Sequence, residues 1–353
     1  TNYWDADAVP DLPGPVTNGG ACTMDGHIYY VGGYDGAAAD GSHWSFSPEI
    51  YIYDIEAGEW STGTQPPHAM SNAGVACHDA SNSVFVFNGY ADLDGDGEFI
   101  DREEGGLDTT EAHTRVYDVA SDAWTERTPA SDGISSAAIG VLDNEIYIAG
   151  GSFDDEDDPT HSGWVTWGTR IYDTISDSWS SGGWLNGYRV RAAGVVYQGQ
   201  LCVVGGYGRI GSAESADETD TWECYADPEW VIQADMLSFP RDGIGAALLG
   251  DHIYAVAGDV GEWVTDRAER WPRGELVPPT PPDGDGDVDG DVDADGDVDG
   301  DVDGDADADG DVEPDGDADG ADGDGEDGCG CRAPGAPPSA AGSRALLTSL
   351  LSM

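Results

Sequence analysis

The tryptophans of this chain recur at a spacing that indicates a repeated unit. Trp4, Trp60, Trp124, Trp179 and Trp230 are each followed, 26 to 28 residues further on, by a pair of small residues that ends a short apolar run. The pairs are Gly32-Gly33, Asn88-Gly89, Gly150-Gly151, Gly205-Gly206 and Ala257-Gly258. Repeated units of this size cannot bury their apolar faces alone, so the pattern predicts a closed array of similar units.

Each unit has the character of short β-strands. Runs such as Ile146-Tyr147-Ile148-Ala149 are continuously apolar and rich in β-branched and aromatic residues, as in strands buried on both faces. The small pair stands where the chain turns tightly or is closely approached. We therefore expect an all-β fold in which the tryptophans pack between neighbouring units, each burying about 150–250 Å².

The tryptophans also have partners at a constant spacing. Six residues lie between the tyrosine and the tryptophan in each of the pairs Tyr53/Trp60, Tyr117/Trp124 and Tyr172/Trp179. With the glycine pairs, this pattern resembles the kelch repeat over residues 1–277. In the fourth unit Tyr225 stands five positions before Trp230, and in the fifth Val264 stands at the expected Tyr position, seven before Trp271. The resemblance implies a β-propeller with four-stranded blades around a central channel.

The number of blades stays open at five or six. Five units are recognisable, and Trp4 lies where a unit should end. Either an N-terminal strand joins the last blade and closes the ring, or an upstream half-unit is missing from the sequence.

Composition changes sharply after the predicted propeller. Residues 278–328 begin Pro-rich and continue as an Asp/Gly alternation, and residues 283–327 hold 23 acidic residues and no basic one. Such a segment buries too little apolar surface to offset its chain entropy, so we expect a disordered spacer. The formal net charge of the chain is −58, which disfavours nucleic acid and anionic membranes as partners and favours cations.

One segment predicts a calcium site. Residues 92–103 match the twelve-residue EF-hand loop, with acids at the usual positions, Gly97 at position 6 and an apolar residue at position 8. The candidate Ca²⁺ ligands are Asp92, Asp94, Asp96, Glu98 and Glu103. The alternative is an ordinary Asp/Gly-rich surface loop. The acidic spacer resembles calcium-binding thrombospondin repeats only loosely, because Gly296 occupies position 12 of its best-matching segment.

The cysteines fall into two groups. In an exported protein a Cys202–Cys224 disulfide is expected, with a Cys22–Cys77 bridge less strongly indicated; the alternative is four buried thiols. Cys329 and Cys331 precede a short apolar end, Ala345–Met353, and this order resembles the myxobacterial sorting tail MYXO-CTERM (residues 329–353). That resemblance implies export and display at the cell surface. Nine apolar residues are too few to span a bilayer, which needs about twenty, and the basic end of such tails is missing.

No catalytic motif stands out, and the seven histidines form no spaced ligand pair. Arg189, Arg191 and Arg241 precede the predicted inner strands and are candidates for receiving a partner's carboxylate; pairing with nearby Asp and Glu is the alternative. Trp164, Trp167 and Trp184 are candidates for stacking on sugars or for packing.

These observations favour an extracytoplasmic, monomeric interaction module that binds a protein or carbohydrate at the propeller face and holds one calcium ion. The second hypothesis is a secreted propeller enzyme acting on carbohydrate, similar to galactose oxidase or sialic acid epimerase.

Overall fold

The computed structural model describes residues 9–37, 44–92, 98–99, 109–110, 112–153, 164–210, 216–233, 237–261 and 264–272. All of them belong to one structural unit, and a second unit, Thr280–Pro337, lies outside them. The predicted spacer and sorting tail, with Cys329 and Cys331, therefore stay predictions. So do the calcium ligands Asp94, Asp96 and Glu103, which also lie outside the described residues.

The fold is all-β, as predicted, and consists of antiparallel sheets that follow one another along the chain. Within the described ranges, four sheets have four strands each, and their strands pair in the order in which they occur. Blade 1 is β1 (Gly20–Met24), β2 (His27–Val31), β5 (Ile50–Asp54) and β6 (Glu59–Thr62). Blade 2 is β8 (Gly74–His78), β9 (Ser83–Phe87), β13 (Thr114–Asp118) and β14 (Ala123–Glu126), with a short 3₁₀ helix at Asp79–Ser81.

The remaining blades repeat this order. Blade 3 is β15 (Ala138–Leu142), β16 (Glu145–Ala149), β19 (Gly168–Asp173) and β20 (Ser178–Trp184). Blade 4 is β22 (Ala193–Tyr197), β23 (Gln200–Val204), β26 (Trp222–Ala226) and β27 (Glu229–Ile232). Blade 5 has three strands in the described ranges: β28 (Gly245–Leu249), β29 (His252–Val256) and β30 (Ala268–Pro272).

In the part of the chain that the structure describes, four small sheets extend the blades at one end. Their strands come from the segments that connect the second and third strands of a blade or that precede its first strand. They are β3 (Tyr34–Ala37), β4 (Trp44–Phe46) and β11 (Glu98–Phe99); β7 (Met70–Ser71), β10 (Tyr90–Ala91) and β12 (Thr109–Thr110); β17 (Ser152–Phe153) and β18 (Trp164–Val165); and β21 (Gly187–Val190), β24 (Tyr207–Ile210) and β25 (Asp217–Glu218). We call this end of the propeller, where β1, β8, β15, β22 and β28 begin, the loop face.

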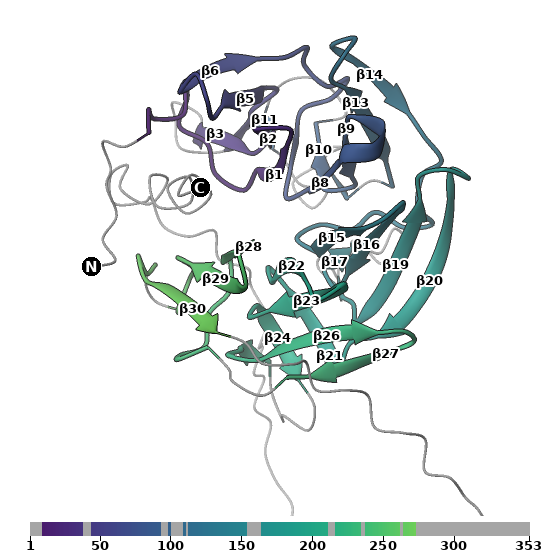
Figure 1. The fold of residues 1–353 in the computed structure, drawn as a ribbon, viewed down its shortest axis with the longest axis vertical. Helices are drawn as coiled ribbons and strands as arrows, with labels where there is room; N and C mark the ends of the chain where they lie inside the picture. The colour runs from purple at the N-terminus through teal and green to yellow at the C-terminus, as the bar shows by residue number, and fades with distance from the viewer. Residues whose placement is uncertain are drawn as a thin grey trace, which may run out of the picture. The chain divides into compact units, whose positions relative to one another are not determined.

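The first strand of each blade lies innermost, and the later strands run outward from it (Figure 1). Strand β8 lies beside both β1 and β15, and β22 lies beside both β15 and β28. Consecutive blades are thus neighbours in space. Within the described ranges, no helix has the length and apolar character needed to cross a membrane.

The apolar core of the described residues lies between neighbouring blades. Ile50 and Tyr117 share a buried cluster between blades 1 and 2, and Phe87 and Tyr172 share one between blades 2 and 3. A third cluster joins blades 3 and 4, and a fourth joins blades 4 and 5. Each sheet therefore depends on its neighbour to exclude water, which is the physical reason why such units occur in arrays.

The strand register of blade 5 differs from the prediction. Trp271 lies on the third strand, opposite Ile253, whereas the sequence pattern had assigned the tyrosine position to Val264, seven residues earlier. In blade 1 the corresponding position, opposite Ile28, is occupied by Tyr53. The assignment of Val264 to the tyrosine position was therefore wrong. A buried tryptophan fills the core position that tyrosine fills elsewhere, because both supply a large aromatic ring.

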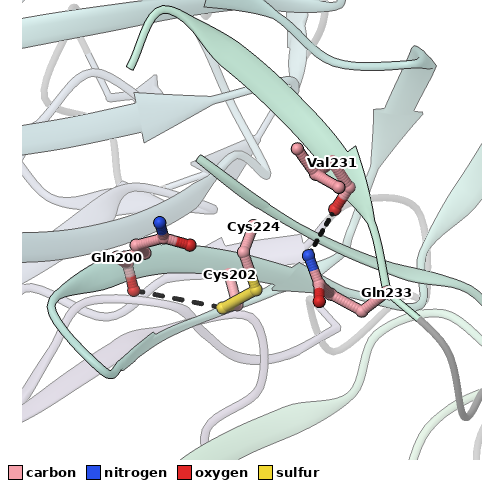
Figure 2. Close-up of a disulfide and its surroundings, with 5 residues drawn as sticks. All are labelled: Gln200, Cys202, Cys224, Val231 and Gln233. Atoms are coloured by element: carbon pink, nitrogen blue, oxygen red, sulfur yellow. Dashed lines mark hydrogen bonds between the residues drawn. A yellow bond between two sulfur atoms is a disulfide. The ribbon is translucent and has the colours of Figure 1, made fainter. Parts of the chain in front are cut away.

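Two disulfides connect strands. Cys202 of β23 is bonded to Cys224 of β26, inside blade 4 (Figure 2). Both side chains are fully buried. Cys22 of β1 is bonded to Cys77 of β8, so this disulfide connects the innermost strands of blades 1 and 2.

Candidate functional site

The centre of the loop face is built by a chain of backbone hydrogen bonds from blade to blade. The N–H of Asn72 donates to the carbonyl oxygen of Asn18 (2.8 Å), and the N–H of Ser136 donates to that of Asn72 (2.8 Å). The N–H of Arg191 donates to Ser136 (2.9 Å), and that of Gly243 donates to Arg191 (2.8 Å). We call these five residues the mouth chain. These hydrogen bonds thus connect one residue from each of the five described blades, just before the first strand of that blade.

All members of the mouth chain have a left-handed backbone, with φ between 53° and 59°. Asparagine and glycine adopt this conformation readily, but arginine does not. Arg191, at φ 56°, is therefore held there by its neighbours, and its side chain remains about half exposed. This geometry makes Arg191 the accessible cation among the three arginines that the sequence singled out.

Arg189 and Arg241 are enclosed instead. The Arg189 guanidinium donates to Glu223 Oε1 at 2.6 Å and to the carbonyl oxygen of Gly205 at 3.1 Å, and both charged side chains are fully buried. Arg241 is likewise buried and paired with Glu269. Arg189 thus pairs within blade 4 and Arg241 within blade 5, which is the local pairing that the sequence left open as the alternative.

Arg191 is paired with a buried carboxylate of the neighbouring blade. Its Nη2 donates to Asp242 Oδ2 at 2.5 Å, while Asp242 Oδ1 has no hydrogen-bond partner among the described residues. Burial raises the pKa of Asp242 to about 6, and the nearby carboxylates of Asp259 and Glu218 add to this, against the opposing effect of Arg191. Burial also raises the pKa of Glu218 above its ordinary value, with Asp217 contributing.

The boundary of blades 4 and 5 thus gathers three carboxylates and one guanidinium on the loop face. Sequence analysis did not identify Asp242, Asp259 or Glu218. One signal was present: Asp242 and Asp259 form a backbone bridge at the positions where blade 3 has Ser135 and Ser152. Two aspartates at facing strand positions repel each other, so they seldom occur there unless they have a function. The pair could therefore have been identified from the sequence as a candidate site.

Two of the predicted calcium ligands, Asp92 and Glu98, lie among the described residues. Asp92 follows β10 and is buried, and its carbonyl oxygen lies 3.1 Å from Nδ1 of His68. Glu98 lies in β11, where its backbone pairs with Ser45 of β4. Asp92 and Glu98 therefore lie at two of the small sheets of the loop face. Among the residues that the structure describes, no group of three or more His, Cys, Asp or Glu side chains is arranged to hold a metal ion.

Comparison with known proteins identifies the repeat. Residues 15–67, which contain blade 1, match the kelch motif. Kelch-like protein 25 of Xenopus tropicalis is 25% identical over 252 residues, which are 71% of this chain and 38% of that protein. Kelch-like protein terF of Aspergillus terreus is 24% identical over 247 residues, 68% of this chain and 49% of that protein. An F-box/kelch-repeat protein of Arabidopsis thaliana is 30% identical over 152 residues, 41% of this chain and 36% of that protein.

The same fold is known from a solved structure. The structure of YjhT superimposes with a TM-score of 0.59 over 74% of this chain and 82% of that one, at 15% identity. This similarity is evidence for a shared fold only. The chain spans between about two fifths and one half of the length of the first two relatives, at 38% and 49%.

Proposed function

We propose that this kelch-repeat β-propeller is an interaction module that binds a protein partner on its loop face. The kelch motif and the similarity to kelch-like proteins support a protein-binding role. The observation that carries the proposal is the mouth chain, which presents Asn18, Arg191 and Gly243 as exposed residues on a rigid backbone. A preorganised surface loses little conformational entropy on binding.

Charge indicates what the partner offers. The net charge of −58 and the carboxylates beside Arg191 favour a partner with a positively charged surface. The alternative of an enzyme acting on carbohydrate has no comparable support in the described residues. Arg191 adds a site where one acidic side chain of the partner can be received within a mainly basic surface.

Site-specific photo-crosslinking in the organism of origin tests the proposal. A photoreactive residue at position 18 or 191 lies on the loop face, whereas one at position 56 or 175 lies in a turn at the opposite end of the blades. We expect one partner protein to be captured from positions 18 and 191, and its capture to weaken as salt is raised. Capture from positions 56 and 175 alone, or from none of the four, contradicts the proposal.

We place the protein outside the cytoplasm. Two disulfides within the propeller support this location, because cytosolic proteins seldom keep structural disulfides. The resemblance of Cys329 and Cys331 to a surface-sorting signal points the same way. Fractionation of the native organism, with detection of the propeller on intact cells or in the medium, tests the location. Recovery of the protein in the cytoplasm with four free thiols at Cys22, Cys77, Cys202 and Cys224 contradicts it.

The structural calcium site belongs to the same proposal. Residues 92–103 supply the oxygen ligands that Ca²⁺ prefers, and two of the candidate ligands, Asp92 and Glu98, follow β10 and pair with β4, respectively. A bound ion at this place stabilises the loop face and sets its local charge.

A further inference from the structure

Two tryptophans of blade 3 stand apart from the others. Trp167 is 49% exposed and Trp184 is 66% exposed, whereas Trp222, Trp230 and Trp271 are buried in the core. The rings of Trp167 and Trp184 lie 5.9 Å apart, centroid to centroid, with an angle of 83° between their planes. The two indoles therefore form a corner that opens to solvent. Neither belongs to the clusters that hold the blades together.

The backbone beneath this corner is well held. Trp184 ends β20 and is paired with Gly168, the first residue of β19, and Trp167 directly precedes that residue. The N–H of Leu185 donates to the carbonyl oxygen of Trp167 at 2.9 Å, and the Leu185 side chain is buried behind it. The N–H of Gly183 is 3.3 Å from the hydroxyl oxygen of Tyr225 in blade 4. A ligand that stacks here meets side chains on a rigid support.

The surroundings are polar without being strongly charged. Exposed Ser180 and Ser181 precede Trp184 along β20, the outermost strand of the blade. The Thr166 hydroxyl lies 3.1 Å from the N–H of Gly168. The neighbouring cation, Arg170, is paired with Asp132 at 2.8 Å. Aromatic faces next to hydroxyl groups suit a ligand that has both C–H faces and hydroxyls, which is the chemistry of a sugar ring.

The size of the patch favours a narrow ligand over a protein. At these exposures the two indoles present roughly 200–300 Å² of surface, taking the usual area of a tryptophan side chain. A stable protein interface buries about 800 Å² on each partner. An acidic polymer is disfavoured by the charge of −58 on the chain, whereas a neutral saccharide experiences no such repulsion.

We propose that Trp167 and Trp184 form a stacking platform for a neutral oligosaccharide on the outer edge of blade 3. One sugar ring lies against each indole face. This site is separate from Arg191 and the mouth chain, so it stands or fails independently of the protein-binding proposal.

Calorimetric titration and tryptophan fluorescence with neutral hexasaccharides test the proposal on the full chain. Cellohexaose, xylohexaose, mannohexaose and maltohexaose are the probes, and a polygalacturonate fragment is the acidic comparison. We expect saturable binding of at least one neutral probe with a change in indole emission. We expect Trp167→Ala and Trp184→Ala each to weaken that binding at least tenfold, and Trp184→Tyr to weaken it less.

The matched control is Ile175→Ala, which removes a 75% exposed apolar side chain from the turn at the other end of the same hairpin. It should leave saccharide affinity unchanged. All variants should keep the melting temperature of the parent, since they remove exposed side chains. The proposal is overturned if no neutral probe binds at millimolar concentration, or if binding survives the double Ala variant. It is also overturned if the double variant leaves saccharide binding intact and abolishes self-association in sedimentation velocity. In that case the two tryptophans form a contact between copies of the chain.

Discussion

The indole N–H of Trp124 in blade 2 donates to the carbonyl oxygen of Thr64, which follows the last strand of blade 1, at 2.6 Å. The N–H of Thr64 in turn donates to Asp122 Oδ1 at 2.7 Å, and the Tyr117 hydroxyl donates to the same oxygen at 2.6 Å. The next boundary repeats this arrangement, with Trp179 donating to Thr128. The Tyr/Trp spacing seen in the sequence is therefore the spacing of an inter-blade clamp.

Replacing Trp124 with phenylalanine tests this clamp. The variant keeps a ring against Tyr117, whose centroid is 5.3 Å from that of Trp124, but it loses the bond to Thr64. We expect a loss of about 1 kcal/mol in the free energy of unfolding, the usual net value of one hydrogen bond. Urea unfolding measures it. Trp184→Phe is the control, because that ring is exposed and should change stability by less than about 0.5 kcal/mol. Equal effects of the two substitutions contradict the clamp.

Asp122 makes the clamp sensitive to acid. Hydrogen bonds from the Thr64 backbone and from the Tyr117 hydroxyl lower the pKa of Asp122 below its usual value of 3.8. A carboxylate with a lowered pKa in the folded state stabilises the fold above its unfolded pKa, and this contribution is lost as pH falls below about 4. We expect Asp122→Asn to lower the melting temperature at pH 7 and to approach the parent as the pH falls below about 4. Glu56→Gln, an exposed charge removal, should show no such convergence.

Asp242 should behave in the opposite direction. Its pKa is raised to about 6 in the folded protein, so ionisation opposes folding, and stability is lost as pH rises from about 4 through 6. We expect Asp242→Asn to raise the melting temperature at pH 8 and to have little effect near pH 4. Asp251→Asn, at a side chain that is 92% exposed, provides the control. A variant that is less stable than the parent at pH 8 shows that the pair with Arg191 outweighs burial.

The two disulfides should differ in their response to reductant. Both side chains of Cys202–Cys224 are fully buried, whereas Cys22 and Cys77 are half-buried. We expect a mild phosphine to reduce Cys22–Cys77 in the folded protein and to reach Cys202–Cys224 only after unfolding. Their sequence separations of 55 and 22 residues correspond to about 4 and 3 kcal/mol of chain-entropy stabilisation, respectively. Alkylation followed by mass spectrometry identifies which cysteines react first, and the reverse order contradicts this expectation.

Calcium should stabilise the protein through Glu103 and not through the adjacent Glu104. Glu103 occupies position 12 of the predicted loop, where a bidentate ligand is required, and Glu104 lies just outside it. We expect calcium to raise the melting temperature of the parent and of Glu104→Ala but not that of Glu103→Ala. A shift that is equal in all three proteins, or absent from the parent, rules the loop site out.

Much of the fold was predictable because its signals are local. A small pair after an apolar run ends one strand, as at Gly150-Gly151, and Trp179 marks the fourth strand of the same blade. Both depend on a few neighbouring residues. Trp271 of the fifth unit was misassigned because a local pattern cannot tell the third strand of a blade from the fourth, and a tryptophan suits both. The pairing of Trp271 with Ile253 shows that it lies on the third strand.

The loop face was far less predictable. Arg189, Arg191 and Arg241 look alike in the sequence, each preceding an inner strand, yet two are enclosed by glutamates and one is half exposed. Their partners stand 28 to 51 residues away in the chain. No local pattern contains that information.

By itself, the sequence determined that repeated β-units would form and where most of their strands would lie, because strand and turn preferences act over a few residues. The tertiary structure alone decided which charges meet and which aromatic rings remain open to water. Burial and Coulomb interactions depend on distance in space, and blades packed against one another bring together residues such as Arg191 and Asp242 that are remote along the chain.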